Sequence, residues 1–99
     1  MRRVSNLAFN REFPSVSGLS GIPKDNKVAV SRDRANQHDS DAVGIWLEGF
    51  PMIPIGWLYR KDSNREAVLR KLDEGETITG HIEVQNRSGK AQKVVIFWL

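Results

Sequence analysis

Apolar and polar residues alternate along several short stretches of the chain, and this period of two is typical of half-buried β-strands. In one stretch, Val28 and Val30 fall on one face, whereas Ala29 and Ser31 fall on the other. The pattern predicts strands over residues 1–10, 27–32, 42–48, 52–58, 76–85 and 92–99. The last stretch is apolar at both alternating positions, which predicts a strand covered on both sides.

One stretch changes to helical spacing. Ser63 and Glu66 match a capping box, in which the two side chains satisfy free backbone N–H groups, and Asp62 is an alternative cap. Gly75 suits the C-terminal cap. The apolar stripe of this predicted helix consists of Ala67, Val68, Leu69 and Leu72.

Proline and glycine residues punctuate the rest. They predict a loop over residues 11–22, with Val16 and Leu19 as its contacts to the core. Pro54 predicts that the fourth strand is irregular in its first half or lies at an edge. Gly80 predicts a bulge or a sharp bend in the fifth strand. The order β-β-β-β-α-β-β therefore predicts a mainly β fold, a small barrel or strongly bent sheet of about six strands, with one helix between strands four and five.

Composition narrows the protein class. The 99 residues fit one domain, 1–99. There is no cysteine, which excludes disulfides and thiolate metal sites. No apolar run could span a bilayer, and no apolar segment of a secretory signal follows Arg2 and Arg3, so a cytoplasmic protein is expected.

The net charge of +3 is mildly basic and by itself indicates no polyanionic partner. The distribution of charge is more informative, because residues 87–93 contain three basic residues and no acidic one. This segment is either a solvated turn or a second arm that contacts phosphates.

The densest polar segment, residues 32–41, lies between two predicted strands, which is where functional loops are often held. Asn36 and Asp39 have two interpretations there. They build a turn, since such side chains bond nearby backbone N–H groups, or they face a ligand. Both roles are compatible in one loop.

The ordered residues of this region resemble the HIRAN domain family over essentially the whole chain. The matching residues are Val28 to Asp33, then Asn36-Gln37-His38-Asp39, then Ala42-Val43, and then Ile55-Gly56-Trp57-Leu58-Tyr59-Arg60. The resemblance implies an OB-like β-barrel that captures single-stranded DNA at its 3′-hydroxyl end, in DNA repair, replication or mobile-element contexts. HIRAN domains are often fused to helicase or nuclease regions.

The resemblance also implies the site. Asp39 matches the carboxylate that contacts the terminal hydroxyl, and Asn36 matches the first motif position. His38 stands at a position where a tyrosine is common, and Ala8 stands where a basic residue is expected. The full set of predicted nucleic-acid-binding residues is Phe9, Arg32, Arg34, Asn36, His38, Asp39, Trp57, Arg60 and Lys61.

These residue types suit a strand end. A carboxylate repels internal phosphates but accepts a hydrogen bond from a free hydroxyl, while arginines hold the neighbouring phosphate and aromatic rings stack on bases. Phe9 is equally compatible with the core. Trp57 shares strand parity with Ile53 and Ile55, which favours burial. Trp46 lies on the opposite face of its strand from the core positions, and Trp98 is expected in the core or at the barrel end.

An enzyme is not expected. His38, Asp39, Asp41 and His81 form no recognised metal-ligand spacing, and there is no nucleophile motif or phosphate-binding glycine loop. No cofactor, metal or membrane partner is predicted. The alternative to DNA binding is an interaction module that docks on a helicase or nuclease through an exposed β edge or an apolar patch.

Overall fold

The chain forms six β-strands and two helices, and a computed structural model describes residues 1–19, 21–23 and 26–99. The strands are β1 (Arg2–Phe9), β2 (Val28–Arg32), β3 (Val43–Leu47), β4 (Gly56–Leu58), β5 (Ile78–Arg87) and β6 (Lys90–Trp98). The helices are α1 (Phe13–Ser17), between β1 and β2, and α2 (Arg65–Asp73), between β4 and β5. Neither is long and apolar enough to cross a membrane, as judged over the described residues.

All six strands are antiparallel and close into a barrel in the order β1-β4-β3-β2-β5-β6. The predicted mainly β fold and the small barrel are therefore confirmed. Inward positions follow the two-residue period, as in β2, where Val28 and Val30 are buried. On β6, residues 94–97 are all at most 1% exposed, which confirms a strand covered on both sides.

The segment predicted as a loop over residues 11–22 contains α1, so the expectation of a single helix is wrong; residue 20 lies outside the described residues. Pro14 fits the first turn, where its missing N–H costs nothing. The predicted contacts Val16 and Leu19 are exposed instead. Phe13 anchors this segment, because it is buried edge-on against the ring of Phe50 at a centroid distance of 5.6 Å.

Helix α2 begins one residue later than the capping box predicts, and that box does not form. Asp62 acts in its place, since Asp62 Oδ1 accepts the Asn64 N–H at 2.9 Å. At the other end, Gly75 adopts a left-handed φ of 81°. The N–H groups of Gly75 and Glu76 then reach the carbonyls of Leu72 and Lys71, which is a Schellman cap and confirms the predicted role of Gly75.

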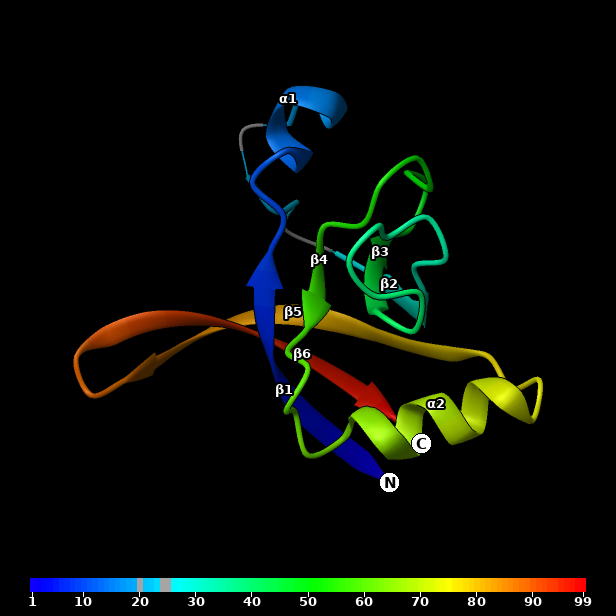
Figure 1. Ribbon diagram of the computed structural model, residues 1–99. Helices are drawn as coiled ribbons and strands as arrows, with labels where there is room; N and C mark the ends of the chain where they lie inside the picture. Colours follow the sequence, from blue (N-terminus) through cyan, green and yellow to red (C-terminus); the bar gives the residue numbers. More distant parts are fainter. Residues whose placement is uncertain (20, 24–25) are drawn as a thin grey trace.

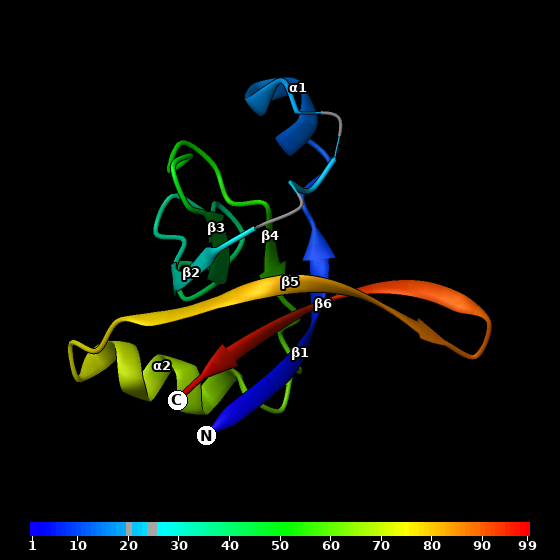
Figure 2. The same cartoon turned by 180° about the vertical axis from the view of Figure 1, so that it is seen from behind.

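The fourth strand is regular only from Gly56 to Leu58, in agreement with the irregularity that Pro54 predicts. Strands β5 and β6 extend further than predicted, and their distal halves project from the barrel as a two-stranded arm (Figure 1 and Figure 2). Both chain ends lie beside α2 in these views. Barrel and arm thus place the polar loop and the basic turn on different parts of the molecule.

Candidate functional site

The 33–42 loop, which joins β2 to β3, is folded around the side chain of Asn36. Asn36 Oδ1 accepts the backbone N–H groups of His38 at 2.8 Å and Asp39 at 3.0 Å. Backbone bonds from Asp33 to Ala42 at 2.8 Å and from Ala42 to Asp39 at 3.0 Å close the loop. Asn36 therefore builds the turn, as its chemistry predicts.

Asp39 ties this loop to α2. Its Oδ2 lies 2.8 Å from Nη2 of Arg65 and 3.5 Å from Nε of Arg60, and its Oδ1 accepts the Asp41 N–H at 3.0 Å. Arg65 also donates to the Asp41 carbonyl at 3.1 Å. With 22% of its side chain exposed, Asp39 braces the loop and keeps a small solvent-facing surface.

The predicted arginines Arg32 and Arg60 differ in how much of the side chain is left exposed. Arg32 lies 2.8 Å from Asp73 and 3.4 Å from Asp41, and the hydrogen bond to Asp73 raises the pKa of its guanidinium, against the opposing effect of burial. Arg32 is therefore engaged by carboxylates. Arg60 donates to the His38 carbonyl at 3.0 Å, but 68% of its side chain is exposed. Arg60 is thus bonded to the loop but keeps enough exposed surface to reach a phosphate.

A cavity of about 490 Å³, here called the loop cavity, opens between the 33–42 loop and the segment before β4. Its lining comprises Asn10, Glu12, Asp33, Ala35, Asn36, Gln37, His38, Trp46, Met52, Ile53, Pro54 and Trp57. Two indoles, three carboxamides and two carboxylates face it, and no lysine or arginine does. The cavity therefore suits an uncharged or cationic planar group and disfavours a phosphate.

The wall of the loop cavity is held by a buried carboxylate. Trp57 Nε1 donates to Asp33 Oδ2 at 2.9 Å, and Asp33 is only 6% exposed. Its Oδ1 accepts no hydrogen bond from the described residues, which leaves one acceptor for a ligand. Asp33 is not among the predicted binding residues, although its position directly after β2 is a signal in the sequence that could have identified it.

The orientation of Trp57 differs from the sequence prediction. Trp57 pairs with Gly44 of β3 and Ala8 of β1, and these positions point to the outside of the barrel. Parity with Ile55 does not extend into β4, because the chain is irregular before Gly56. Trp57 is therefore a half-buried outer-face residue, and the predicted core position is wrong.

The remaining predicted residues lie away from the loop cavity. Phe9 packs against the core at the barrel end, with Nζ of Lys93 5.0 Å from its ring centroid. Arg34 is exposed beside the C-terminal end of α2, and Lys61 is exposed in the turn after β4. Of the nine predicted residues, three line the cavity (Asn36, His38 and Trp57), and Asp39 and Arg60 lie directly beside it.

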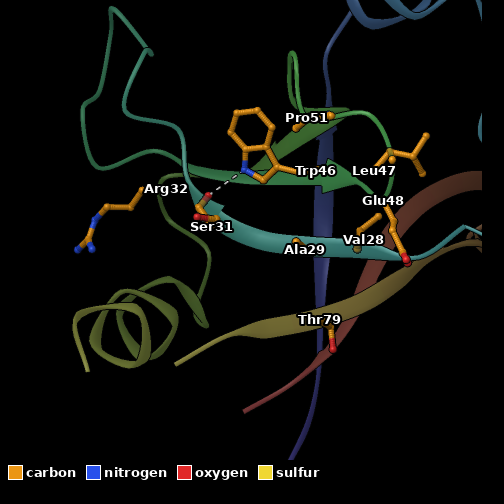
Figure 3. A pocket seen from close by; sticks show the side chains of 10 residues that line it. Val28, Ala29, Ser31, Arg32, Trp46, Leu47, Glu48, Pro51 and Thr79 are labelled. Carbon is orange, nitrogen blue, oxygen red and sulfur yellow. Dashed lines mark hydrogen bonds between the residues drawn. The ribbon is translucent and has the colours of Figure 1, made fainter. Parts of the chain in front are cut away.

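A second cavity of about 750 Å³, the outer-face cavity, lies over β2, β3 and β5 (Figure 3). Trp46 borders both cavities and donates its indole N–H to the Ser31 carbonyl at 3.3 Å. Gly44 leaves room for this ring, because a Cβ there would lie 2.7 Å from Trp46 Nε1. Trp46 is thus an outer-face residue, as its strand position predicts.

Trp98 is half exposed beside His81, with a ring-centroid distance of 5.9 Å, so the expected core position does not hold and the barrel end does. Within the described residues, no group of three or more metal-ligating side chains gathers. No protein-family model matches the chain, and neither a curated protein nor a solved structure matches it.

Proposed function

We propose that this protein is a non-catalytic module that binds single-stranded DNA or a DNA end at the loop cavity. The observation that carries the proposal is the pairing of two indoles and the Gln37 carboxamide in the lining of the cavity with the exposed guanidinium of Arg60 beside it. Bases stack on aromatic rings at about 1–3 kcal/mol each. The HIRAN-like order of residues supports the same function. The proposal includes an OB-like form of the barrel and a location in the cytoplasm.

The charge distribution suggests how a strand would lie. The cavity has the carboxylates of Glu12 and Asp33 and no cation, so a phosphate would stay outside it. An uncharged base enters and contacts Trp57, while its exocyclic amine donates to Asp33 Oδ1. The phosphate on that nucleotide then lies at the rim, within reach of Arg60.

His38 gives the cleanest test of this arrangement. Its imidazole is exposed and makes no hydrogen bond to the described residues, while its backbone N–H and carbonyl hold the loop. We expect His38→Ala to weaken binding of a labelled single strand by about fivefold or more, since a stacking contact of about 1 kcal/mol is lost. Fluorescence anisotropy measures the affinity.

The matched control is His81→Ala, which removes the second of the two histidines in the chain. His81 lies on the outer face of β5. This variant should leave the affinity within experimental error. Equal weakening by both variants, or no binding by the parent protein at low salt, would overturn the loop cavity as the nucleic-acid site.

End recognition is tested separately. A 3′-hydroxyl strand should bind more tightly than the same strand with a 3′-phosphate, because only the hydroxyl can donate to Asp39. Asp39→Asn should remove that preference. Equal affinity of the parent protein for both strands would mean that the site reads a strand and not its end.

Docking of a helicase or nuclease partner is the second candidate. It is favoured by the outer-face cavity, whose lining is mainly apolar around Trp46 and Leu47. If the parent protein binds no nucleic acid at low salt, and Thr79→Arg, at an exposed position of the same cavity, abolishes binding of a helicase or nuclease partner, this candidate replaces the first.

A further inference from the structure

The distal parts of β5 and β6 form an arm that pairs with no other strand of the barrel. β2 pairs with β5 only as far as Gly80, and β1 pairs with β6 only from Val94 onward. The Asn26 side chain bonds both backbone groups of Ile82, which is the last anchor on β5. We call residues 84–93 the ribbon.

Within the ribbon, four cross-strand pairs lie beyond the backbone pairing with β1 and β2, and Lys93 Nζ lies over the Phe9 ring of β1 at 5.0 Å. They are Val84 with Lys93, Gln85 with Gln92, Asn86 with Ala91, and Arg87 with Lys90. The ribbon turns at Ser88 and Gly89, both with positive φ, which is the type I′ geometry that matches strand twist. It extends away from the barrel in both views (Figure 1 and Figure 2).

The ribbon is cationic. It carries Arg87, Lys90 and Lys93, and no acidic residue follows Glu83 in the chain. Arg87 and Lys90 stand directly opposite each other, an arrangement of like charges that destabilises a strand pair. None of the three forms an ion pair with the described residues, and Arg87 bonds only to Gln85 at 3.2 Å. A polyanion bound between Arg87 and Lys90 would relieve the repulsion between these two side chains.

We propose that the ribbon is a second binding site, which inserts into a groove of duplex nucleic acid and places Arg87 and Lys90 against its phosphates. This inference rests on the proposed function for the class of ligand. The major groove of B-DNA admits a two-stranded β-ribbon. The protein would then hold a duplex with the ribbon and the adjoining single strand with the loop cavity.

The residue types of the ribbon favour a duplex over other polyanions. It has no aromatic side chain, so it lacks a platform for stacking single-stranded bases. Its apolar residues are only Val84 and Ala91, so it lacks the bulky side chains that insert into a membrane surface. The ribbon does carry cationic and carboxamide side chains on two narrow strands. Such groups contact phosphates and the edges of bases in a groove.

The test uses the full chain with the double variant Arg87→Ala/Lys90→Ala and a labelled blunt duplex of about two helical turns. We expect the variant to lose about tenfold in duplex affinity and to reduce the slope of log affinity against log salt by about two, since two phosphate contacts disappear. Its affinity for a single strand should change less than twofold. Its thermal midpoint should be unchanged or higher, because like-charge repulsion is removed.

The control variant Arg2→Ala/Arg70→Ala removes the same charge from two exposed positions outside the ribbon. Equal loss of duplex affinity in both variants would mean that the loss follows from the change in net charge alone, and it would overturn the proposal. Absence of duplex binding by the parent would overturn it too, as would tighter binding of anionic vesicles than of duplex. His38→Ala should weaken single-strand binding alone, so failure of the loop cavity and failure of the ribbon remain distinguishable.

Discussion

Asp33 shows how one buried side chain connects the barrel to the candidate site. Its backbone N–H pairs with Ala42 at the base of the 33–42 loop, and its carboxylate holds the indole of Trp57. At 6% exposure the carboxylate is largely withdrawn from water. Asp33 therefore fixes both the loop base and the wall of the loop cavity.

We expect Asp33→Ala to lower the free energy of unfolding by about 1–3 kcal/mol, because the Trp57 N–H loses its acceptor in a half-buried position. Urea denaturation followed by tryptophan fluorescence measures this change. Glu48→Ala is the control, since that exposed carboxylate bonds to none of the described residues. A loss in the Asp33 variant no larger than in the control would show that the hydrogen bond contributes nothing net.

Local chemistry was predictable at single residues, and long-range placement was not. The turn around Asn36 follows from its own side chain, and the C-terminal cap at Gly75 follows from glycine's freedom at positive φ. The outward position of Trp57 depends on its register with Gly44, which comes from a distant part of the chain. Phe13 was missed as an anchor because its partner Phe50 is equally distant.

At the scale of elements, the two-residue period located all six strands, but it did not set their lengths. β4 is shorter than predicted, because the irregular chain around Pro54 delays pairing until Gly56. β5 is longer, because the ribbon continues beyond the barrel. Helix α1 has only five residues, too few for an apolar helical period to show in the sequence.

The close approach of β5 to β6 at Gly80 gives a test at this scale. Gly80 faces the β6 backbone so closely that an added Cβ would collide with the carbonyl oxygen of Ile96. We expect Gly80→Ala to destabilise the protein by about 1–3 kcal/mol or more, because backbone cannot move aside as a flexible side chain can. Differential scanning calorimetry records the change in thermal midpoint.

Gly21→Ala is the matched control, because nothing lies within 4 Å of the corresponding Cβ position and its φ is not positive. That variant should unfold at or slightly above the temperature of the parent. A parent-like midpoint for Gly80→Ala would instead mean that β5 can bend away from β6 at little cost.

For the whole molecule, the sequence predicted a small barrel but not its order. Closure joins β1 to both β4 and β6, and the β1–β6 pair spans nearly the full length of the chain. Pairing at such separation leaves no periodic signal. As a result of this closure, the Met1 amino group bonds the Leu99 carbonyl at 2.6 Å.

This proximity predicts that the chain tolerates a circular permutation. Joining Leu99 to Met1 through a short glycine-serine linker and opening the chain between Ser88 and Gly89 should leave unfolding cooperative, within about 2 kcal/mol of the parent, since short-loop closure terms are small. Chemical denaturation measures this. Opening between Val94 and Val95, inside the fully paired part of β6, should abolish the barrel; a folded protein from that opening would contradict the assigned closure.

The β1–β6 seam, where these two strands pair and the chain ends meet, also determines how the molecule responds to mechanical force. Its ends lie on adjacent antiparallel strands, with Arg2 opposite Trp98. Hydrogen bonds between such strands run perpendicular to the chain direction. A pull that separates Met1 from Leu99 therefore loads these bonds one after another rather than together, and the barrel should peel open from this seam at low force, whatever its stability against heat or denaturant.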